Sequence, residues 1–185
     1  RLQAGDFVVV LGPGPIGLLS ALTAKAAGAR HVAIVGTPAD EEVRLSKARE
    51  LGLDTVLNLA ETDPIEAVMD LTNGIGADMV IECSGAPPAI ASTVKYVRKL
   101  GKVCAIGLTG GGAVQFPWDD AMKKVCEIIF NLSTQYTSWD RTIALIASGK
   151  IPAGRVISHR EPLANWEQVF ADVEELQALK ALLVP

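Results

Sequence analysis

The sequence predicts an α/β protein built on a doubly wound, six-stranded parallel sheet, and two observations support this prediction. Short apolar runs, rich in β-branched residues, alternate along the chain with longer segments of helical pattern. The short runs are apolar at nearly every position, which is typical of strands that helices bury on both faces. Strands of this kind, separated by helices, form a parallel sheet between two helical layers.

The predicted elements follow one another in a regular rhythm up to residue 147. The predicted strands span 7–11, 31–35, 54–58, 79–83, 102–107 and 126–132. The predicted helices span 16–27, 41–51, 64–72, 88–100 and 139–147, and most of them are followed by a glycine that suits a helix end. Segment 108–118 contains three consecutive glycines and a proline, which predicts a loop.

Composition narrows the classes of function. The 185 residues give room for one full domain with a sizeable core, or for one domain plus an appendage. Net charge is −4 and no run of Lys or Arg stands out, so neither nucleic acid nor a membrane surface is an expected partner. Cys83, Cys104 and Cys126 lie far apart without a C-x-x-C pair, which argues against a disulfide framework and favours the cytoplasm.

A glycine motif gives the strongest indication of function. The segment GPGPIG at 12–17 follows the first predicted strand directly and opens the first predicted helix. Gly12 permits the tight turn, Gly14 lets a pyrophosphate approach the backbone, and Gly17 lets helix and strand pack closely. Pro15 and Ile16 begin a helix whose free N–H groups and dipole attract an anion. The motif predicts a dinucleotide site of the Rossmann type; a tight turn without a ligand is the alternative.

The end of the second strand bears on the type of dinucleotide. An NAD site usually places an acid there, about 20 residues after the first glycine, to hold the ribose 2′-hydroxyl. This sequence has Gly36 and Thr37 instead, so nothing there repels a 2′-phosphate, which Thr37 and Arg44 could bind. We therefore favour NADP over NAD, although the acids at 40–42 argue for NAD. Thr37 with Asp40 also fits a helix cap, and Arg44 also fits a solvated helix charge.

Two further strand ends are predicted to face the cofactor. In an open α/β sheet, ligands bind at the carboxyl ends of the strands. The residues that follow the fourth and fifth strands should therefore flank the ribose and the nicotinamide; ordinary turns are the alternative. These residues are Cys83, Ser84, Gly85, Ile106, Gly107 and Leu108.

No catalytic residue and no metal ligand are predicted in the chain. His31 and His159 have no Cys, Glu or second His at ligand spacing, so a structural or surface role is favoured for both. The sequence contains neither a Tyr-x-x-x-Lys pair nor a G-x-S-x-G elbow. It predicts a cofactor platform that is inactive alone.

The alternation ends near residue 157. A loop or short strand is followed by an amphipathic helix at 165–176 and a last strand at 181–184. We therefore assign residues 1–156 to a dinucleotide-binding domain and residues 157–185 to a segment that belongs to a second domain.

Several segments together resemble the coenzyme domain of zinc-dependent medium-chain dehydrogenases, above all the sorbitol (L-iditol) and threonine dehydrogenase branch. They cover nearly the whole chain and lie at 8–17, 47–52 (KARELG), 78–85 (DMVIECSG), 145–151 (LIASGKI) and 157–185. The resemblance implies hydride exchange between a nicotinamide cofactor and a secondary alcohol or polyol. It also implies that zinc is held by a catalytic domain outside these residues, to which the tail returns.

The resemblance carries three further implications. Lys180, just before the last strand, is placed to reach the pyrophosphate. Family members associate through an edge strand, here 126–132, so a homo-oligomer is expected. Gly36 departs from the NAD-using members, which carry an acid at that position.

Two other functions stay open at this point. The chain could be a nicotinamide-sensing module that regulates a partner, although a sensor has no need of a strand that pairs with another domain. It could also belong to a zinc-independent oxidoreductase that resembles quinone reductases.

Overall fold

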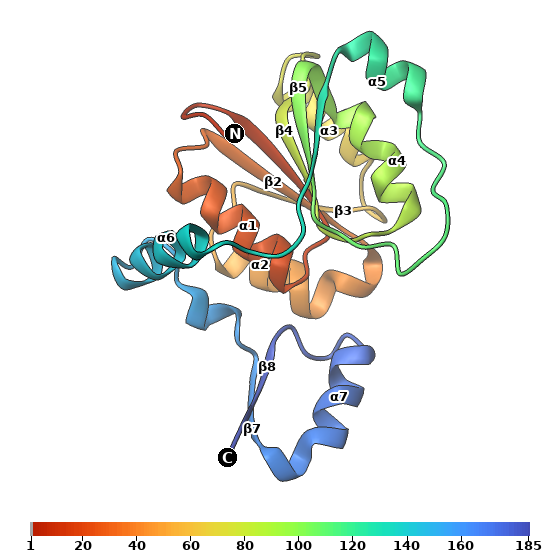
Figure 1. The fold of residues 1–185 in the computed structure, drawn as a ribbon. Helices are drawn as coiled ribbons and strands as arrows, with labels where there is room; N and C mark the ends of the chain where they lie inside the picture. The colour runs from red at the N-terminus through yellow and green to blue at the C-terminus, as the bar shows by residue number, and fades with distance from the viewer. Residues whose placement is uncertain (1) are drawn as a thin grey trace.

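The computed structural model describes residues 2–185 and contains a six-stranded parallel sheet (Figure 1). Its strands are β1 (Phe7–Leu11), β2 (His31–Gly36), β3 (Thr55–Asn58), β4 (Ala77–Glu82), β5 (Val97–Ala105) and β6 (Glu127–Phe130). Their order is β3-β2-β1-β4-β5-β6, and every neighbouring pair is parallel. The chain thus moves outward from β1 to β3 and then from β4 to β6, which confirms the predicted doubly wound fold.

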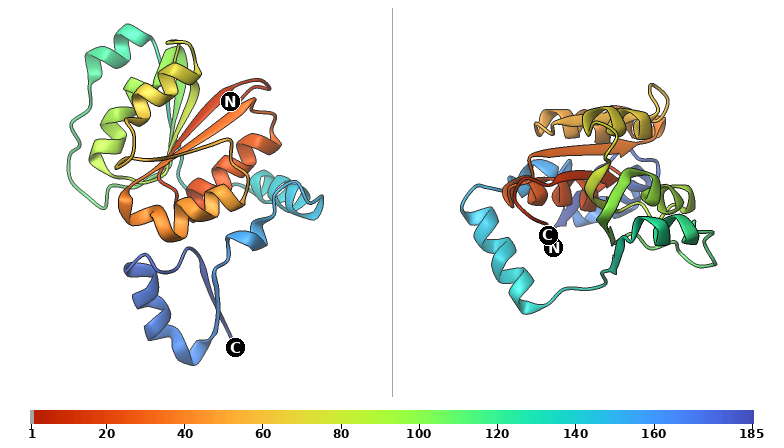
Figure 2. Two further views of the ribbon diagram at one scale, coloured as in Figure 1. Left: turned by 180° about the vertical axis from the view of Figure 1, so that it is seen from behind. Right: turned by 90° about the horizontal axis from the view of Figure 1, so that it is seen from above.

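Helices cover both faces of the sheet (Figures 1 and 2). Val8 and Val10 point to the face that packs against Leu18 of α1, and Val9 points to the opposite face with Val68 of α3. This alternation explains the continuous apolar run in β1, because each of its side chains is buried against one helical layer or the other. The helices are α1 (Pro15–Ala26), α2 (Ser46–Glu50), α3 (Pro64–Leu71), α4 (Pro87–Tyr96), α5 (Trp118–Lys124) and α6 (Tyr136–Ala147).

Three local features differ from the predicted elements. The predicted helix 88–100 ends at Tyr96, and the next residues enter β5 through an irregular pairing in which Leu100 has φ +58°. The predicted helix 41–51 begins with a 3₁₀ turn (Pro38–Asp40) and a π turn (Glu41–Leu45) before α2. A short helix that the sequence does not predict, α5, begins at Trp118, the last residue of the predicted loop 108–118.

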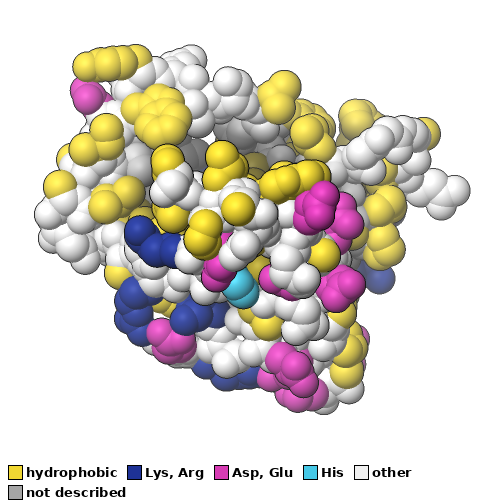
Figure 3. Space-filling model, turned by 90° about the horizontal axis from the view of Figure 1, so that it is seen from below, with side chains coloured by type: hydrophobic (Ala, Val, Ile, Leu, Met, Phe, Trp, Pro, Cys, Tyr) yellow, Lys and Arg dark blue, Asp and Glu magenta, His cyan; other side chains and the backbone are white. Residues whose placement is uncertain are grey.

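The C-terminal segment forms a separate small unit below the main sheet in Figure 1. β7 (His159–Pro162) and β8 (Ala181–Val184) pair in parallel, and α7 (Trp166–Glu174) connects them. Ile151, Val156 and Leu179 are buried in the core cluster on the α1 face and so attach this unit to the sheet. Figure 3 views this end of the molecule and shows apolar side chains exposed among charged ones. The exposed apolar residues of the unit include Leu163, Trp166, Phe170 and Val173.

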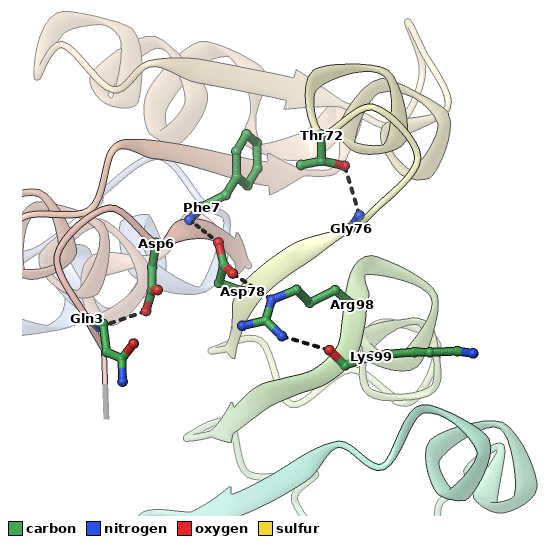
Figure 4. Close-up of polar contacts among 8 residues, drawn as sticks. All are labelled: Gln3, Asp6, Phe7, Thr72, Gly76, Asp78, Arg98 and Lys99. Carbon is green, nitrogen blue, oxygen red and sulfur yellow. Dashed lines mark hydrogen bonds and ion pairs between the residues drawn. The ribbon is translucent and has the colours of Figure 1, made fainter.

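The amino ends of the strands are tied together at the edge opposite the carboxyl ends (Figure 4). Asp78, near the start of β4, accepts a hydrogen bond from the amide of Phe7 in β1 at 2.7 Å. The same carboxylate forms an ion pair with Arg98 of β5 at 2.6 Å. Polar side chains at this edge therefore hold three neighbouring strands in register. No helix within residues 2–185 is long and apolar enough to cross a membrane.

Candidate functional site

A cavity of about 990 Å³ opens at the carboxyl ends of β1, β2, β3 and β4. β1 and β4 are the pair at which the strand order reverses, and such a switch point is where open α/β sheets bind their ligands. The lining residues are Leu11–Gly14, Val35–Thr37, Asp40, Arg44, Leu59–Ile65, Cys83, Ser84, Ala86, Pro88, Ala89, Ser92 and Tyr96.

The glycine motif forms the turn from β1 into α1 at the edge of this cavity. Gly12 has φ +97°, and its amide donates a hydrogen bond to the carbonyl of Val35 at 3.0 Å. A Cβ added to Gly17 would stand 1.9 Å from the carbonyl oxygen of Gly12, so this close packing excludes any side chain. A Cβ added to Gly14 would meet no atom within 4 Å. The backbone at Gly14 is therefore bare and faces open space, as an approaching diphosphate requires.

The first turn of α1 offers unpaired donors at the same place. Gly14 is the N-cap, and its carbonyl accepts the first helical hydrogen bond, from the amide of Leu18 at 2.9 Å. Pro15 has no N–H, and the amides of Ile16 and Gly17 lie too early in the helix to reach an acceptor within it. No acidic residue occupies the first turn. The positive end of the helix dipole thus faces the cavity rim without a neutralising carboxylate, and the turn fits a diphosphate.

Gly36 stands where an acid could hold a ribose hydroxyl, and packing keeps this position small. A Cβ there would lie 2.8 Å from Cγ of Pro13 and 2.9 Å from Cδ2 of Leu45. Thr37 follows, and both its amide and its hydroxyl donate to Oδ2 of Asp40, at 2.9 and 2.7 Å. Thr37 and Asp40 form a capping box, so the helix-cap interpretation of Thr37 is correct.

Arg44 also lines the cavity and is held by Asp40. Its guanidinium donates to Oδ1 of Asp40 at 3.0 Å, and only 19% of the arginine side chain is exposed. The Nε atom of Arg44 is buried and has no hydrogen-bond partner among the described residues. Arg44 is therefore a partly buried cation at the cavity wall and not a freely solvated helix charge.

The third side of the cavity, which the sequence does not predict, is formed by the loop 59–65 and by α4 along its length. Asp63 in this loop caps α3 by accepting hydrogen bonds from the amides of Ile65 and Glu66. Tyr96 lies on this side, and burial raises the pKa of its hydroxyl to about 12. The rule that ligands lie at carboxyl strand ends applies to β3 as well and could have indicated the loop 59–65.

The loops that follow β4 and β5 lie next to the cavity, but only the first lines it. Cys83 and Ser84 belong to the lining, whereas residues 106–108 lie outside it. Burial raises the pKa of the Cys83 thiol to about 12, so this cysteine is a neutral part of the wall at physiological pH. A Cβ on Gly85 would stand 2.1 Å from the carbonyl oxygen of Leu108, which shows how tightly the two loops pack.

The structure therefore brings half of the predicted site residues to one cavity. Those that line it are Gly12, Gly14, Gly36, Thr37, Arg44, Cys83 and Ser84. Those that do not line it are Pro15, Ile16, Gly17, Gly85, Ile106, Gly107 and Leu108, and Lys180 is exposed outside it.

Both histidines contact side chains that are not metal ligands. His31 shares a hydrogen bond of 2.9 Å with the hydroxyl of Thr55 and stacks on Phe7, and His159 shares one of 2.8 Å with Ser158. Across residues 2–185, no three His, Cys, Asp or Glu side chains gather in an arrangement that could hold a metal ion. The described residues therefore do not fit a zinc site, and no zinc-dependent step can be assigned to them.

A doubly wound sheet with a glycine turn at its switch point defines the class of dinucleotide-binding domains. Comparison with known proteins identifies the family. The model of the zinc-binding dehydrogenase family matches residues 15–148. The chain belongs to this family, and it is a coenzyme-binding region of the kind found in zinc-type medium-chain dehydrogenases.

Similar proteins support this assignment along the whole chain. A sorbitol dehydrogenase from Halalkalibacterium halodurans is 36% identical over all of this chain and 53% of its own length. An L-threonine 3-dehydrogenase from Bacillus licheniformis is 32% identical with the same coverage. The structure of an alcohol dehydrogenase from Thermus sp. ATN1 superposes with a TM-score of 0.91 at 30% identity, over 100% of this chain and 52% of that one. The chain thus spans about half the length of the curated relatives it matches.

Proposed function

We propose that this chain binds a nicotinamide dinucleotide across the carboxyl ends of β1, β2 and β4. The observation that carries the proposal is the bare backbone at Gly14, which faces open space at the start of α1. The free amides of that turn would hold the diphosphate, and the cavity beside Gly36 would take the adenosine. The nicotinamide would then extend toward the residues 106–108 that follow β5.

The proposed reaction is hydride exchange between the nicotinamide and a secondary alcohol or polyol. Family membership supports a dehydrogenase, and two of the relatives are named a sorbitol dehydrogenase and a D-arabitol-phosphate dehydrogenase. When bound, the nicotinamide accepts or donates the hydride. The residues of this chain bind and orient the dinucleotide, and zinc would be held by a part of the protein outside these 185 residues. Without that part, the chain should bind the cofactor and show no turnover.

We favour NADP over NAD as the bound dinucleotide. Gly36 offers no carboxylate to a ribose 2′-hydroxyl, and Arg44 at the cavity wall keeps guanidinium N–H groups beyond the one that donates to Asp40. Three acids also line the cavity and would repel a 2′-phosphate, but the negative charges of two of them are already balanced by hydrogen-bond donors. Asp40 is paired with Arg44, and Asp63 accepts two amides of α3. Glu61 is the third acid and favours NAD.

Two further proposals concern contacts with other protein parts. The exposed apolar side of α7, with Trp166 and Phe170, would pack against the remaining half of a full-length dehydrogenase. We place the boundary between the two domains at residues 156 and 157. The free edge of β6 would pair with a second copy of the chain, because Phe130 is 83% exposed there.

Titration of the chain with NADH and with NADPH, followed by dihydronicotinamide fluorescence, tests the binding proposal. We expect both to bind and NADPH to bind more tightly. Tighter binding of NADH would contradict the preference for NADP, and failure of both to bind would overturn the proposed function.

A further inference from the structure

Glu82 is a buried carboxylate at the carboxyl end of β4, only 1% exposed to solvent. A charge at this burial is costly unless its oxygens are hydrogen-bonded. Oε1 of Glu82 accepts hydrogen bonds from the amide and the hydroxyl of Ser84, the former at 2.8 Å. The amide of Gly85 lies 3.1 Å from Oε1 and 3.2 Å from Oε2. The carboxylate therefore accepts hydrogen bonds from three donors of the loop that follows β4, namely the amide and hydroxyl of Ser84 and the amide of Gly85.

The backbone of the same residue holds the neighbouring loop. The carbonyl of Glu82 accepts hydrogen bonds from the amides of Ile106 at 2.9 Å and Gly107 at 3.0 Å. These two residues directly follow β5. Glu82 thus fixes the loop of its own strand with its carboxylate and the loop of the next strand with its carbonyl.

Two glycines leave the space that this arrangement needs. A Cβ on Gly107 would stand 2.5 Å from Oε2 of Glu82 and 2.2 Å from the amide nitrogen of Gly85. A Cβ on Gly12 would stand 2.9 Å from Cβ of Ser84. The loop that Glu82 holds therefore packs directly on the glycine turn of β1. The side chain and the backbone of Glu82 thus together link the ends of three strands.

We propose that Glu82 is a positioning residue for the coenzyme, which it does not touch itself. The inference rests on the proposed function, because it assigns the loops at 84–85 and 106–108 to the dinucleotide beyond its adenosine diphosphate. Ser84 lines the cavity, but its hydroxyl donates to Glu82 and accepts from the amide of Ala86 at 3.1 Å. Its role is therefore to set the shape of the wall, and it has no hydrogen left to donate to a ligand.

The test compares two substitutions in one strand. Glu82→Gln keeps the size of the side chain but replaces one acceptor oxygen with a donor that faces N–H groups. Asp78→Asn makes the same chemical change at the opposite end of β4, where the carboxylate binds Phe7 and Arg98 (Figure 4). The two probes are the more tightly bound of NADH and NADPH, and ADP, which lacks the nicotinamide half.

We expect Glu82→Gln to weaken binding of the dinucleotide about tenfold, since hydrogen bonds to a charged group are lost, and to change binding of ADP less than about twofold. Amide hydrogen exchange at 84–85 should accelerate, because the carboxylate accepts from these two amides, while exchange at 37–44 stays unchanged. Asp78→Asn should alter neither affinity by more than about twofold.

Equal weakening of both probes, or unchanged binding of the dinucleotide, would overturn the positioning role while the proposed function stands. Failure of the unaltered chain to bind NADH and NADPH would overturn both. Ser84→Ala is a milder variant for the case that Glu82→Gln does not fold. It removes the hydroxyl that donates to Glu82 and accepts from Ala86, and it leaves the two amide hydrogen bonds to the carboxylate. We expect Ser84→Ala to weaken dinucleotide binding about threefold, and an unchanged dissociation constant would count against the proposal.

Discussion

The Cα of Gly17 lies so close to the carbonyl oxygen of Gly12 that an added Cβ would stand 1.9 Å from that oxygen. The first turn of α1 is therefore pressed against the backbone of the β1 turn. This contact fixes the direction of the helix axis, and it brings the free amides of the first turn to the rim of the cavity.

Gly17→Ala should destabilise the chain by about 3 kcal/mol, because backbone cannot move aside as a flexible side chain can. Gly154→Ala is the matched control, since a Cβ at Gly154 meets no atom within 4 Å. Urea unfolding followed by circular dichroism measures both. A cost below about 0.5 kcal/mol for Gly17→Ala would show that the helix can shift freely at this point.

Gly14→Asp should abolish binding of NADH and NADPH while the fold is kept. The new side chain has room, so the fold tolerates it, but it places a carboxylate where we propose the diphosphate lies. Fluorescence titration measures the affinity for each dinucleotide, and circular dichroism shows whether the fold is kept. Gly154→Asp adds the same charge away from the cavity and should leave binding unchanged. Retained affinity in Gly14→Asp would place the coenzyme elsewhere.

Arg44→Gln should weaken the binding of NADPH about tenfold, because a charge-assisted contact with the 2′-phosphate is lost. The affinity for NADH should change less than about twofold. Arg141, which is exposed on α6, provides the control substitution Arg141→Gln. Calorimetric titration of both dinucleotides gives the ratio of their affinities. An equal loss for NADH and NADPH would mean that Arg44 supports the Thr37–Asp40 cap only.

Asp78 should make the stability of the chain depend on acidic pH. Burial raises its pKa, but hydrogen bonds from Phe7 and Arg98 outweigh this and lower the pKa below the ordinary 3.8. The unfolded chain therefore takes up the proton first. The stabilisation is present above about pH 4 and is lost as the pH falls through the folded-state pKa.

The substitution Asp78→Asn removes this dependence. We expect it to lower the free energy of unfolding by about 1 kcal/mol at pH 7, and by less as the pH falls toward 3. Urea unfolding at several pH values measures the difference. A difference that stays constant from pH 7 to pH 3 would contradict the role of the carboxylate charge.

Phe130→Lys should weaken self-association without unfolding the chain. The amide of Asn131 donates to Ala105 of β5, so by strand alternation the amide of residue 130 points to the free edge of β6. A lysine there hinders pairing between edges. Sedimentation velocity gives the molar mass, with Ile75→Lys, at another exposed apolar residue, as the control. A dimer that persists in Phe130→Lys would exclude the β6 edge as the interface.

Much of the fold could be predicted because the relevant forces act locally. A strand buried on both faces must be apolar throughout, as β1 is, and a turn that packs on its own helix must carry glycine at 12 and 17. The end of the helix before β5 was placed four residues too late. Helical propensity takes no account of the pairing between Val97 and Ala77, and this pairing makes Val97 the first residue of β5.

The sequence by itself determined the doubly wound sheet, the glycine turn and the family resemblance, because residue spacing along one chain encodes them directly. Only the tertiary structure decided that Asp40 would hold both Thr37 and Arg44, that the loop 59–65 would close the cavity, and that Glu82 would join two loops. The physical reason is that these contacts depend on the distances and directions of side chains that the sheet brings together. The order of residues along the chain does not specify these distances, because they arise only when the strands have paired.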